Sequence, residues 1–588
     1  MSCRRSIRSY SIRPGTRHAV AAGWPGWLGF IAGLVLSAPA LGAGSNLLVN
    51  PGFESDVAPW ITWGDASLVA TDQVVQSGQF SGRVTGRTAE WQGAVQAVPL
   101  GSLEPGRSYR LRAWARIAGA SSEPLAMTIA KEDGDGLAFP RVIDSTGHED
   151  RWVLLDEVYT HTVTGTLTRF DFYVHGPAAG VDLFVDDLSF EPLPLDWQSE
   201  ADARIEAIRK RDLEVVVVDG LGLPVENAQI LIEQQSRDFP VGTVMAAGPL
   251  DTEPSYRDYI TEHFNWTVHE NAVKWYATEP VQGQVDYSTA DAMLEWAENE
   301  GLKVRGHTIF WAPEQWQPAW VPGLDDITLQ AEVEDRLEDL VSRYRERFEH
   351  WDVNNEMLAG SFYADRLGPD IRAWMFERTR QLDPGAELFV NDFNVVSSNK
   401  TDRYVEFVQQ LDDADIPVDA IGAQGHFTEV DPWAVKVRLD KLATLGRPIW
   451  ITEFDVVQAD ENDRADALEA FFRMAFSHPA VEGIVLWGFW AGSHWRGPDA
   501  ALVDLDWTVN AAGQRFEALM DEWWSNETLQ TDSAGRTSAR VFHGTYRFTV
   551  TASGQPTAVV HVAVPAGAAP REVRIDLDVL YADSFETL

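Results

Sequence analysis

Two glutamates, Glu356 and Glu453, are the residues of this chain best suited to paired acid and nucleophile chemistry. Glu356 ends the segment WDVNNE and Glu453 lies in the segment ITEFD. A proton donor facing a nucleophilic carboxylate cleaves glycosidic bonds, and the retaining mechanism needs the two carboxyl groups about 5–5.5 Å apart. Two glutamates buried here as structural residues without ion partners would be costly. The pair therefore predicts glycosidic bond cleavage.

The two carboxyl groups must differ in proton affinity to take different roles. Burial beside the strand of Trp351, together with the nearby second carboxylate, is expected to raise the pKa of Glu356. A hydrogen bond from His426 is expected to keep Glu453 ionised. We therefore predict that Glu356 is the acid/base and that Glu453 is the nucleophile.

The elements that must position this pair begin after Phe239, where apolar strands alternate with amphipathic helices. Helical stretches are expected at 288–301, 329–348 and 403–413. Eight strands are expected at 240–244, 265–269, 303–310, 350–354, 388–391, 420–424, 448–452 and 483–487. Eight strand–helix units in roughly 290 residues predict an α/β fold, a (β/α)8 TIM barrel, over residues 238–526.

The active site of such a barrel forms at the C-terminal ends of its strands. Nearly every predicted strand here ends in polar or aromatic residues. Any one of them is more often a satisfied structural group, but their convergence on one rim favours a functional site. The residues are Glu270, Asn271, Lys274, Trp275, His307, Trp311, Asn354, Asn355, Glu356, Gln424, His426, Glu453, Asp455, Trp487 and Trp490.

The regions on either side of the barrel are rich in strands. Residues 44–195 carry short alternating runs between Gly, Pro and Asp turns, which is typical of a β-sandwich. Residues 196–237 are expected to form a connector helix at 200–211 and a β-hairpin at 213–234, and residues 527–588 return to strand-like alternation. Because neither short β region could fold alone, we expect the two to pack together as a small satellite sandwich.

The first 40 residues have the pattern of a secretory signal peptide. Five arginines without an acid precede the apolar run 27–36 and the sequence Ala-Pro-Ala. This run is too short to span a bilayer, and the sole cysteine, Cys3, would leave with the peptide. We expect a secreted, extracellular or periplasmic, monomer that has no disulfide and no membrane contact after processing.

The charge and the aromatic content indicate the class of partner. The formal net charge of −42 disfavours nucleic acid and anionic membranes, whereas a neutral polysaccharide would not be repelled. The chain also has 24 tryptophans, more than a core needs, and flat aromatic faces in a cleft suit sugar rings.

Several segments of the barrel resemble glycoside hydrolase family 10, especially its plant-type branch. They are WDVNNE at 351–356, ITEFD at 451–455, RGHTIFW at 305–311, GAQGH at 422–426, HENAVKWYATEPVQGQVDY from 269 and LWGFW from 486. The resemblance covers the whole barrel in order. It implies a retaining endo-1,4-β-xylanase that acts on xylan and xylo-oligosaccharides, needs no catalytic cofactor, and uses Glu356 and Glu453 as named above.

The same resemblance implies roles for the surrounding residues. Asn355 is expected to bind the 2-hydroxyl of the sugar at the cleaved bond, and His426 to orient the nucleophile with support from Gln424 and Asp455. Glu270, Asn271, Lys274 and His307 would hold hydroxyls on the glycone side, with Trp311 and Trp487 as walls and platforms. Trp495 stands where the family often has another subsite tryptophan. One departure is Ala312, which stands where many bacterial members have a second histidine, so the +1 side of the cleft is expected to differ.

The N-terminal region resembles carbohydrate-binding modules of the 4/9/22 type through NPGFE at 50–54, GRTAEWQGAVQ from 86 and FVDDLSF at 184–190. That resemblance implies sugar stacking on Trp91 and Tyr173, although either could be a core aromatic. It also implies a structural calcium held by Glu54 and Asp187, since oxygen ligands suit a hard cation.

Two other functions stay open from the sequence alone. A β-1,4-glucanase or mixed-linkage glucanase would use the same mechanism, because only exclusion of the 5-hydroxymethyl group separates xylose from glucose. A non-catalytic polysaccharide-binding protein is the second alternative, and loss of either glutamate would have been its sign.

Overall fold

The structure is a computed structural model that describes residues 45–577. The predicted signal peptide, residues 1–40, lies outside the described residues. Between 45 and 577, no helix combines the length and the apolar character needed to cross a membrane.

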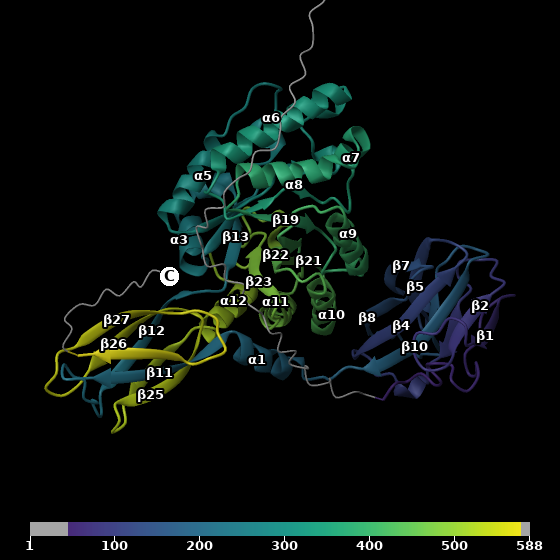
Figure 1. Ribbon diagram of the computed structural model, residues 1–588, viewed down its shortest axis with the longest axis horizontal. Helices are drawn as coiled ribbons and strands as arrows, with labels where there is room; N and C mark the ends of the chain where they lie inside the picture. The colour runs from purple at the N-terminus through teal and green to yellow at the C-terminus, as the bar shows by residue number, and fades with distance from the viewer. Residues whose placement is uncertain (1–44, 578–588) are drawn as a thin grey trace, which may run out of the picture. The chain divides into compact units, whose positions relative to one another are not determined.

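The region after Phe239 is a closed barrel of eight parallel strands (Figure 1). The eighth strand pairs with the first, which closes the barrel and confirms the predicted fold. The strands are β13 (Val241–Met245), β14 (Trp266–His269), β15 (Lys303–Gly306), β17 (His350–Asp352), β19 (Glu387–Asp392), β20 (Ala420–Ala423), β22 (Ile449–Val456) and β23 (Val481–Leu486).

Short pairs of strands extend the barrel at its C-terminal rim. The stretch expected as one strand at 303–310 is divided into β15 and the separate β16 (Phe310–Trp311), which pairs with β18 (Asn354–Asn355). Likewise β21 (His426–Phe427) pairs with the end of β22, placing His426 opposite Asp455. These pairs fix the backbone of the residues that the sequence singles out.

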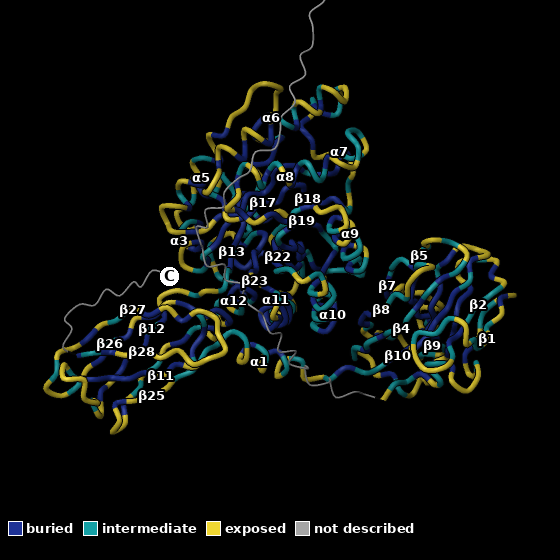
Figure 2. The backbone as a smooth tube through the Cα atoms, in the orientation of Figure 1, coloured by how far each residue is buried: buried dark blue, intermediate teal, exposed yellow. Residues whose placement is uncertain are grey.

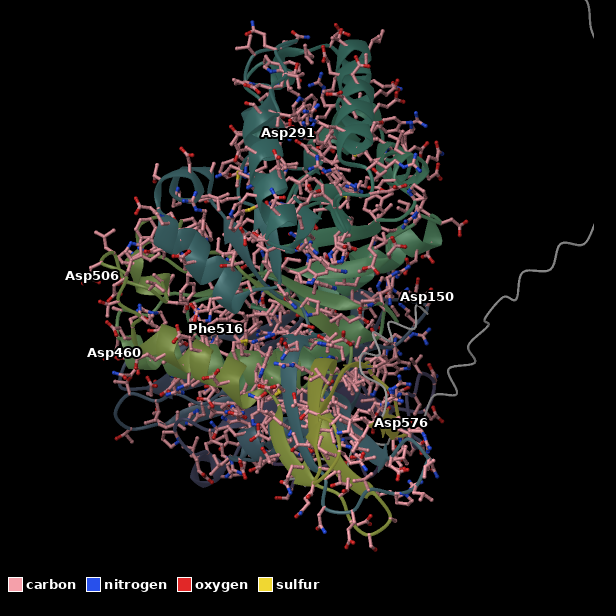
Figure 3. The ribbon with its side chains drawn as sticks, turned by 90° about the vertical axis from the view of Figure 1, so that its left-hand side faces the viewer. Asp150, Asp291, Asp460, Asp506, Phe516 and Asp576 are labelled. Atoms are coloured by element: carbon pink, nitrogen blue, oxygen red, sulfur yellow. The ribbon has the colours of Figure 1, made fainter. Side chains whose placement is uncertain are left out.

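Amphipathic helices surround the strands, so that the barrel centre is buried while the outer helix surfaces are exposed (Figure 2). Carboxylate caps start several of them: Asp325 accepts from Thr328 N, and Asp460, labelled in Figure 3, accepts from Asn462 N. Phe516 is fully buried, and its ring lies 5.7 Å from that of Phe472. The helices are α2 (Ala247–Thr252), α3 (Pro254–His263), α4 (Trp275–Thr278), α5 (Ser288–Asn299), α6 (Asp326–Tyr344), α7 (Phe362–Leu367), α8 (Ile371–Leu382), α9 (Thr401–Asp413), α10 (Pro432–Ala443), α11 (Glu461–Phe476) and α12 (Ala511–Glu522).

The N-terminal module is a sandwich of two antiparallel sheets, as predicted. Its inward faces bury aromatic residues such as Tyr109, Phe172 and Phe190. One sheet contains β1 (Ser67–Thr71), β2 (Ser81–Thr85), β10 (Asp182–Pro192), β4 (Ser108–Ala118) and β8 (Val153–Thr160). The other contains β3 (Ala94–Ala97), β9 (Arg169–His175), β5 (Ser122–Asp133), β6 (Gly136–Ala138) and β7 (Arg141–His148).

The segments before and after the barrel combine into a second sandwich, which confirms the expected satellite domain. In Figure 1 the teal strands β11 and β12 lie among yellow strands from the C-terminal region. One sheet is β25 (Arg536–Phe542), β11 (Lys210–Val218) and β28 (Arg571–Asp576). The other is β24 (Asn526–Gln530), β12 (Gln229–Arg237), β26 (Gly544–Thr551) and β27 (Ala558–Val564).

The predicted hairpin at 213–234 is wrong. The turn itself exists, because Val225 N donates to Val217 O at 3.0 Å, but β11 and β12 then enter opposite sheets. Each strand finds its partners in the C-terminal segment, where Leu213, Ile230 and Phe548 share one core. Burial between two sheets stabilises the chain more than an isolated two-stranded hairpin does. The connector helix, α1 (Trp197–Ile208), begins at Asp196, which caps it through Ser199 N.

Candidate active site

A cleft of about 1020 Å³ opens at the C-terminal end of the barrel strands. The twelve residues predicted as catalytic or substrate-binding all line it: Glu270, Asn271, Lys274, His307, Trp311, Asn355, Glu356, Gln424, His426, Glu453, Trp487 and Trp495. Asp455 lies behind this lining, bonded to His426 and Trp495. The structure therefore brings these thirteen residues together, whereas Trp275, Asn354 and Trp490, which were also expected at the rim, do not line the cleft. Trp275 and Trp490 pack into the barrel core instead.

Glu356 is held in an unusual backbone conformation at the end of β18. Its φ is 61°, in the left-handed region that non-glycine residues rarely adopt and that costs on the order of 1–3 kcal/mol. Two contacts from the end of β19 hold this turn: Glu356 N donates to Asn391 O at 2.8 Å, and Leu358 N donates to Asp392 Oδ2 at 2.7 Å. The backbone is thus fixed so that the Glu356 side chain faces the cleft.

The surroundings of the Glu356 carboxyl favour its protonated form. Burial raises its pKa, and the charge of Glu453 raises it further, while hydrogen bonds from Trp311 and Gln424 act in the opposite direction. Gln424 Nε2 donates to Glu356 Oε1 at 3.2 Å. Gln424 therefore contacts Glu356, whereas the family resemblance implied that Gln424 helps to orient Glu453.

Asp392 is a second buried carboxyl beside Glu356. Burial raises its pKa to about 7, and the charge of Glu356 adds to the shift. Its oxygens accept from the backbone N–H groups of Leu358 and Phe393, which links the ends of β18 and β19. Its position makes it a support for the turn that carries Glu356.

Glu453, in contrast, is surrounded by hydrogen-bond donors. Asn391 Nδ2 donates to Glu453 Oε1 at 3.0 Å, and His426 Nε2 lies 3.3 Å from Glu453 Oε2. Thr452 Oγ1 donates to Asn391 Oδ1 at 2.6 Å, which sets the orientation of the Asn391 amide. Donors aimed at both oxygens suit an ionised carboxylate.

His426 carries a positive charge in this network. Burial lowers its pKa, but the hydrogen bonds and charges of Asp455 and Glu453 outweigh burial and raise the pKa to about 9. His426 Nδ1 lies 2.9 Å from Asp455 Oδ2, and Asp455 also accepts from Arg496 Nη1 at 2.7 Å and Trp495 Nε1 at 2.8 Å. A protonated His426 therefore donates toward both Glu453 and Asp455.

One end of the cleft presents polar groups suited to hydroxyls. Burial lowers the pKa of Lys274, although the charges of Glu453 and Glu270 oppose this. Burial raises the pKa of Glu270. Asn271 Oδ1 accepts from Tyr276 at 2.7 Å and faces Lys274 Nζ at 3.4 Å.

Below these groups the barrel interior contains a buried ionic network. Asp352 pairs with Arg305 at 2.8 Å through one oxygen and with His307 Nδ1 at 2.8 Å through the other. Burial raises the pKa of Asp352, but the charge of Arg305 and the bond from His307 prevail and lower it. This network fixes the ring of His307, which leaves its Nε2 edge for the cleft.

Some residues of the site were not predicted. Asn391 and Asp392 were expected only as a strand end, yet they contact Glu453 and the turn of Glu356. Arg496, in the loop after β23, pairs with Asp455. The segment VNDF, with its paired polar residues at a strand end, was the available signal for Asn391 and Asp392. Arg496 lies in a loop that carries no such pattern.

The N-terminal module has its own cavity of about 530 Å³, lined by Trp63, Trp91, Phe139, Arg169 and Tyr173. Trp91 is 46% exposed, so its ring is available to a ligand. Tyr173 is 4% exposed, and its ring packs on Trp63 and His175. The structure thus joins the two predicted aromatics in one cavity, with Tyr173 as its buried floor.

The residues predicted to hold calcium, Glu54 and Asp187, both have side-chain atoms near Gly52. A Cβ on Gly52 would be 3.6 Å from Asp187 Oδ1 and 3.7 Å from Glu54 Cγ. Glu54 accepts from the backbone N–H groups of Gln79 at 2.9 Å and Phe80 at 3.2 Å. Among residues 45–577, no three His, Cys, Asp or Glu side chains form a group that could hold a metal ion.

Two regions of the chain match known protein families. Residues 231–517 match the family model described as glycosyl hydrolase family 10, and residues 45–180 match a carbohydrate binding domain. Among solved structures, xylanase 10B from Thermotoga petrophila in complex with xylobiose aligns with a TM-score of 0.45 at 24% identity, over 48% of this chain and 94% of that chain.

Curated relatives have similar sequences over longer stretches. Anti-sigma-I factor RsgI6 of Acetivibrio thermocellus is 46% identical over 61% of this chain and 47% of its own length. Endo-1,4-beta-xylanase 3 of Arabidopsis thaliana is 34% identical over 92% of this chain and 74% of its own length. The chain spans about half the length of several other relatives that it matches. Because the chain is 34% identical to endo-1,4-beta-xylanase 3 over 74% of that protein's length, and because residues 231–517 match the family model, the chain belongs to glycosyl hydrolase family 10.

Proposed function

We propose that this protein is a retaining endo-1,4-β-xylanase that hydrolyses internal bonds of xylan. The main support for the proposal is that two glutamates in one cleft have surroundings that favour opposite protonation states. Burial and a neighbouring charge raise the pKa of Glu356, while Asn391 and His426 direct donors at both oxygens of Glu453. A protonated acid and an ionised nucleophile are the two starting states that a double displacement requires.

The proposed reaction proceeds in two steps. Glu453 attacks the anomeric carbon as the glycosidic C–O bond breaks, and Glu356 gives its proton to the departing oxygen. Glu356, now ionised, then takes a proton from water, whose oxygen displaces Glu453 and releases a product with the original configuration. The side chains of Lys274, Glu270 and Asn271 would hold hydroxyls of the bound sugar on the glycone side. The two carboxyl groups and water complete the proton balance without a cofactor.

The direct test is release of reducing ends from xylan and from carboxymethylcellulose, measured side by side. We expect rapid release from xylan and slow or undetectable release from the cellulose derivative. Faster action on the glucan would support the glucanase alternative. Binding to both polymers without any release would support the non-catalytic alternative.

We propose that the N-terminal module tethers the enzyme to polysaccharide through Trp91. A Trp91→Ala substitution in the full chain should lower the rate on insoluble xylan by about tenfold, because a tethered binder raises the local concentration of the cleft at the polymer. The rate on short soluble xylo-oligosaccharides should not change. Equal losses on both substrates would show that the module supports the barrel structurally instead.

We further propose that calcium binds the module at Glu54 and Asp187. The support is that both carboxylate side chains approach Gly52, since carboxylates and carbonyls suit this ion. Calcium should raise the midpoint of the module's thermal unfolding, and a chelator should reverse the increase, by linkage. Glu54→Gln should abolish this response. An unfolding curve that calcium leaves unchanged would contradict the proposal.

Export and assembly complete the proposal. The arginine-rich start, the apolar run and Ala38-Pro39-Ala40 support secretion with cleavage near residue 40. We expect culture supernatant or periplasm to contain a chain that begins shortly after Ala40, as measured by mass spectrometry of the intact protein. Light scattering should give the mass of a monomer.

A further inference from the structure

Trp316 is an exposed aromatic residue in the wall of the active-site cleft. Its side chain lines the cleft and is 44% exposed, whereas the neighbouring Trp320 and Trp275 pack into the barrel core. Trp316 is the last residue of the short 3-10 turn η2 (Glu314–Trp316). This turn comes shortly after Ala312, the residue that stands where many bacterial members of the family have a second histidine. None of the roles discussed above uses Trp316.

The turn that carries Trp316 is held by several hydrogen bonds, although the Trp316 ring is exposed. Trp316 N donates to Pro313 O at 3.2 Å. The next residue, Gln317, is 8% exposed, and its amide nitrogen donates to the carbonyl oxygens of Trp311 and Pro313, while its amide oxygen accepts from Tyr363. A ring held in this way can bind a ligand with little loss of conformational entropy.

The contacts of Trp311 show on which side of the cleft Trp316 lies. The two indole rings stack with centroids 4.6 Å apart and planes 9° from parallel. Lys274 Nζ lies 4.6 Å from the centroid of the same Trp311 ring. A stacked indole and an ammonium group at these distances cannot share one face, so Trp316 occupies the face of Trp311 opposite Lys274.

The loop after the acid/base packs against the start of the same turn. Phe362 N donates to Ala312 O at 3.1 Å, and a Cβ on Gly360 would come within 2.3 Å of Pro313 N. The turn of Trp316 therefore packs against the chain that follows Glu356. Lys274, which is proposed to hold the glycone together with Glu270 and Asn271, lies over the other face of Trp311.

We propose that Trp316 is a platform for a sugar on the leaving-group side, beyond the sugar unit attached to the cleaved bond. Its free face offers flat apolar surface, which the C–H face of a pyranose can cover. Glu314, which belongs to the same turn, and Asp365 also line this cleft, so an uncharged xylose unit fits better than a uronic acid. The proposal rests on the xylanase function and adds a binding site to it.

The test compares substrates with long and short leaving groups in the wild-type chain, Trp316→Ala and Trp316→Phe. For xylohexaose, Trp316→Ala should lower kcat/KM about tenfold or more, as truncation of an aromatic anchor does at other binding sites. For a nitrophenyl xylobioside, whose leaving group is too short to reach the platform, kcat/KM should change less than about twofold. Trp316→Phe should recover most of the loss, because it keeps a flat ring.

Other outcomes would overturn the proposal. Equal losses on both substrates would show that Trp316 only holds Trp311 against Glu356, and no loss on either would show that the ring has no role. Thermal unfolding of each variant, expected to match the wild type because the ring is half exposed, excludes a folding defect. A wild-type chain that cleaves neither substrate would instead refute the xylanase proposal itself.

Discussion

Replacement of Glu453 by Gln is expected to lower kcat on xylan by a factor on the order of 10⁴ or more. The amide has nearly the same shape as the carboxylate, but it cannot form the glycosyl-enzyme. Because Asn391 and His426 fix the position of this side chain rather than the substrate itself, binding of xylo-oligosaccharides should persist. Steady-state rates on xylan check the loss of kcat, and calorimetric titration of the inactive variant with xylotetraose checks that binding persists.

The matched control is Glu300→Gln, the same chemical change at an exposed position at the end of α5. It should leave both rate and binding at the wild-type level. Activity retained in Glu453→Gln would show that another carboxylate is the nucleophile. Loss of binding together with activity would show that the substitution had disturbed the cleft.

The second large effect is expected from Glu356→Ala. Loss of the acid/base should slow xylan hydrolysis by about 10²–10⁴-fold, because neither departure of the sugar nor attack by water is assisted. With a nitrophenyl xylobioside the first step needs no proton, so the glycosyl-enzyme on Glu453 should accumulate. A rapid burst of nitrophenol followed by a slow steady state is the expected record, and intact-protein mass spectrometry should detect the adduct.

The pH dependence of kcat/KM gives an independent test of the role of Glu356. Burial and the charge of Glu453 raise the pKa of Glu356, so the protonated form required by the first step persists to higher pH than for an ordinary glutamate. The alkaline decline of kcat/KM on xylan should therefore lie above the usual range of a glutamate. In Glu356→Ala acting on the nitrophenyl substrate, this decline should disappear.

The barrel and its rim could be predicted from the sequence because both follow local rules. Apolar runs of strand length recur between amphipathic helices, and functional side chains stand at the ends of those runs, so eleven of the twelve cleft residues were found without coordinates. The twelfth, Trp495, was implied only by the family resemblance. The raised pKa of Glu356 also followed from burial and a second carboxylate. Each of these inferences needs only neighbouring residues and the geometry common to all such barrels.

What could not be predicted depends on contacts between distant segments. The strands β11 and β12 appear as a hairpin until the C-terminal strands provide better partners more than 300 residues away. The contact of Asp392 with Leu358 N joins two loops that the sequence separates. The stacking of Trp316 on Trp311 likewise depends on the path of a turn that no local pattern specifies.

The central claim, that Glu356 is the acid/base of a retaining enzyme, is tested most directly by azide rescue of Glu356→Ala. Azide needs no general base, so it should attack the glycosyl-enzyme on Glu453 and restore turnover of the nitrophenyl xylobioside. Proton NMR of the product should show the β-configured glycosyl azide, the result of two inversions. No rescue, or formation of the α-azide, would contradict this account.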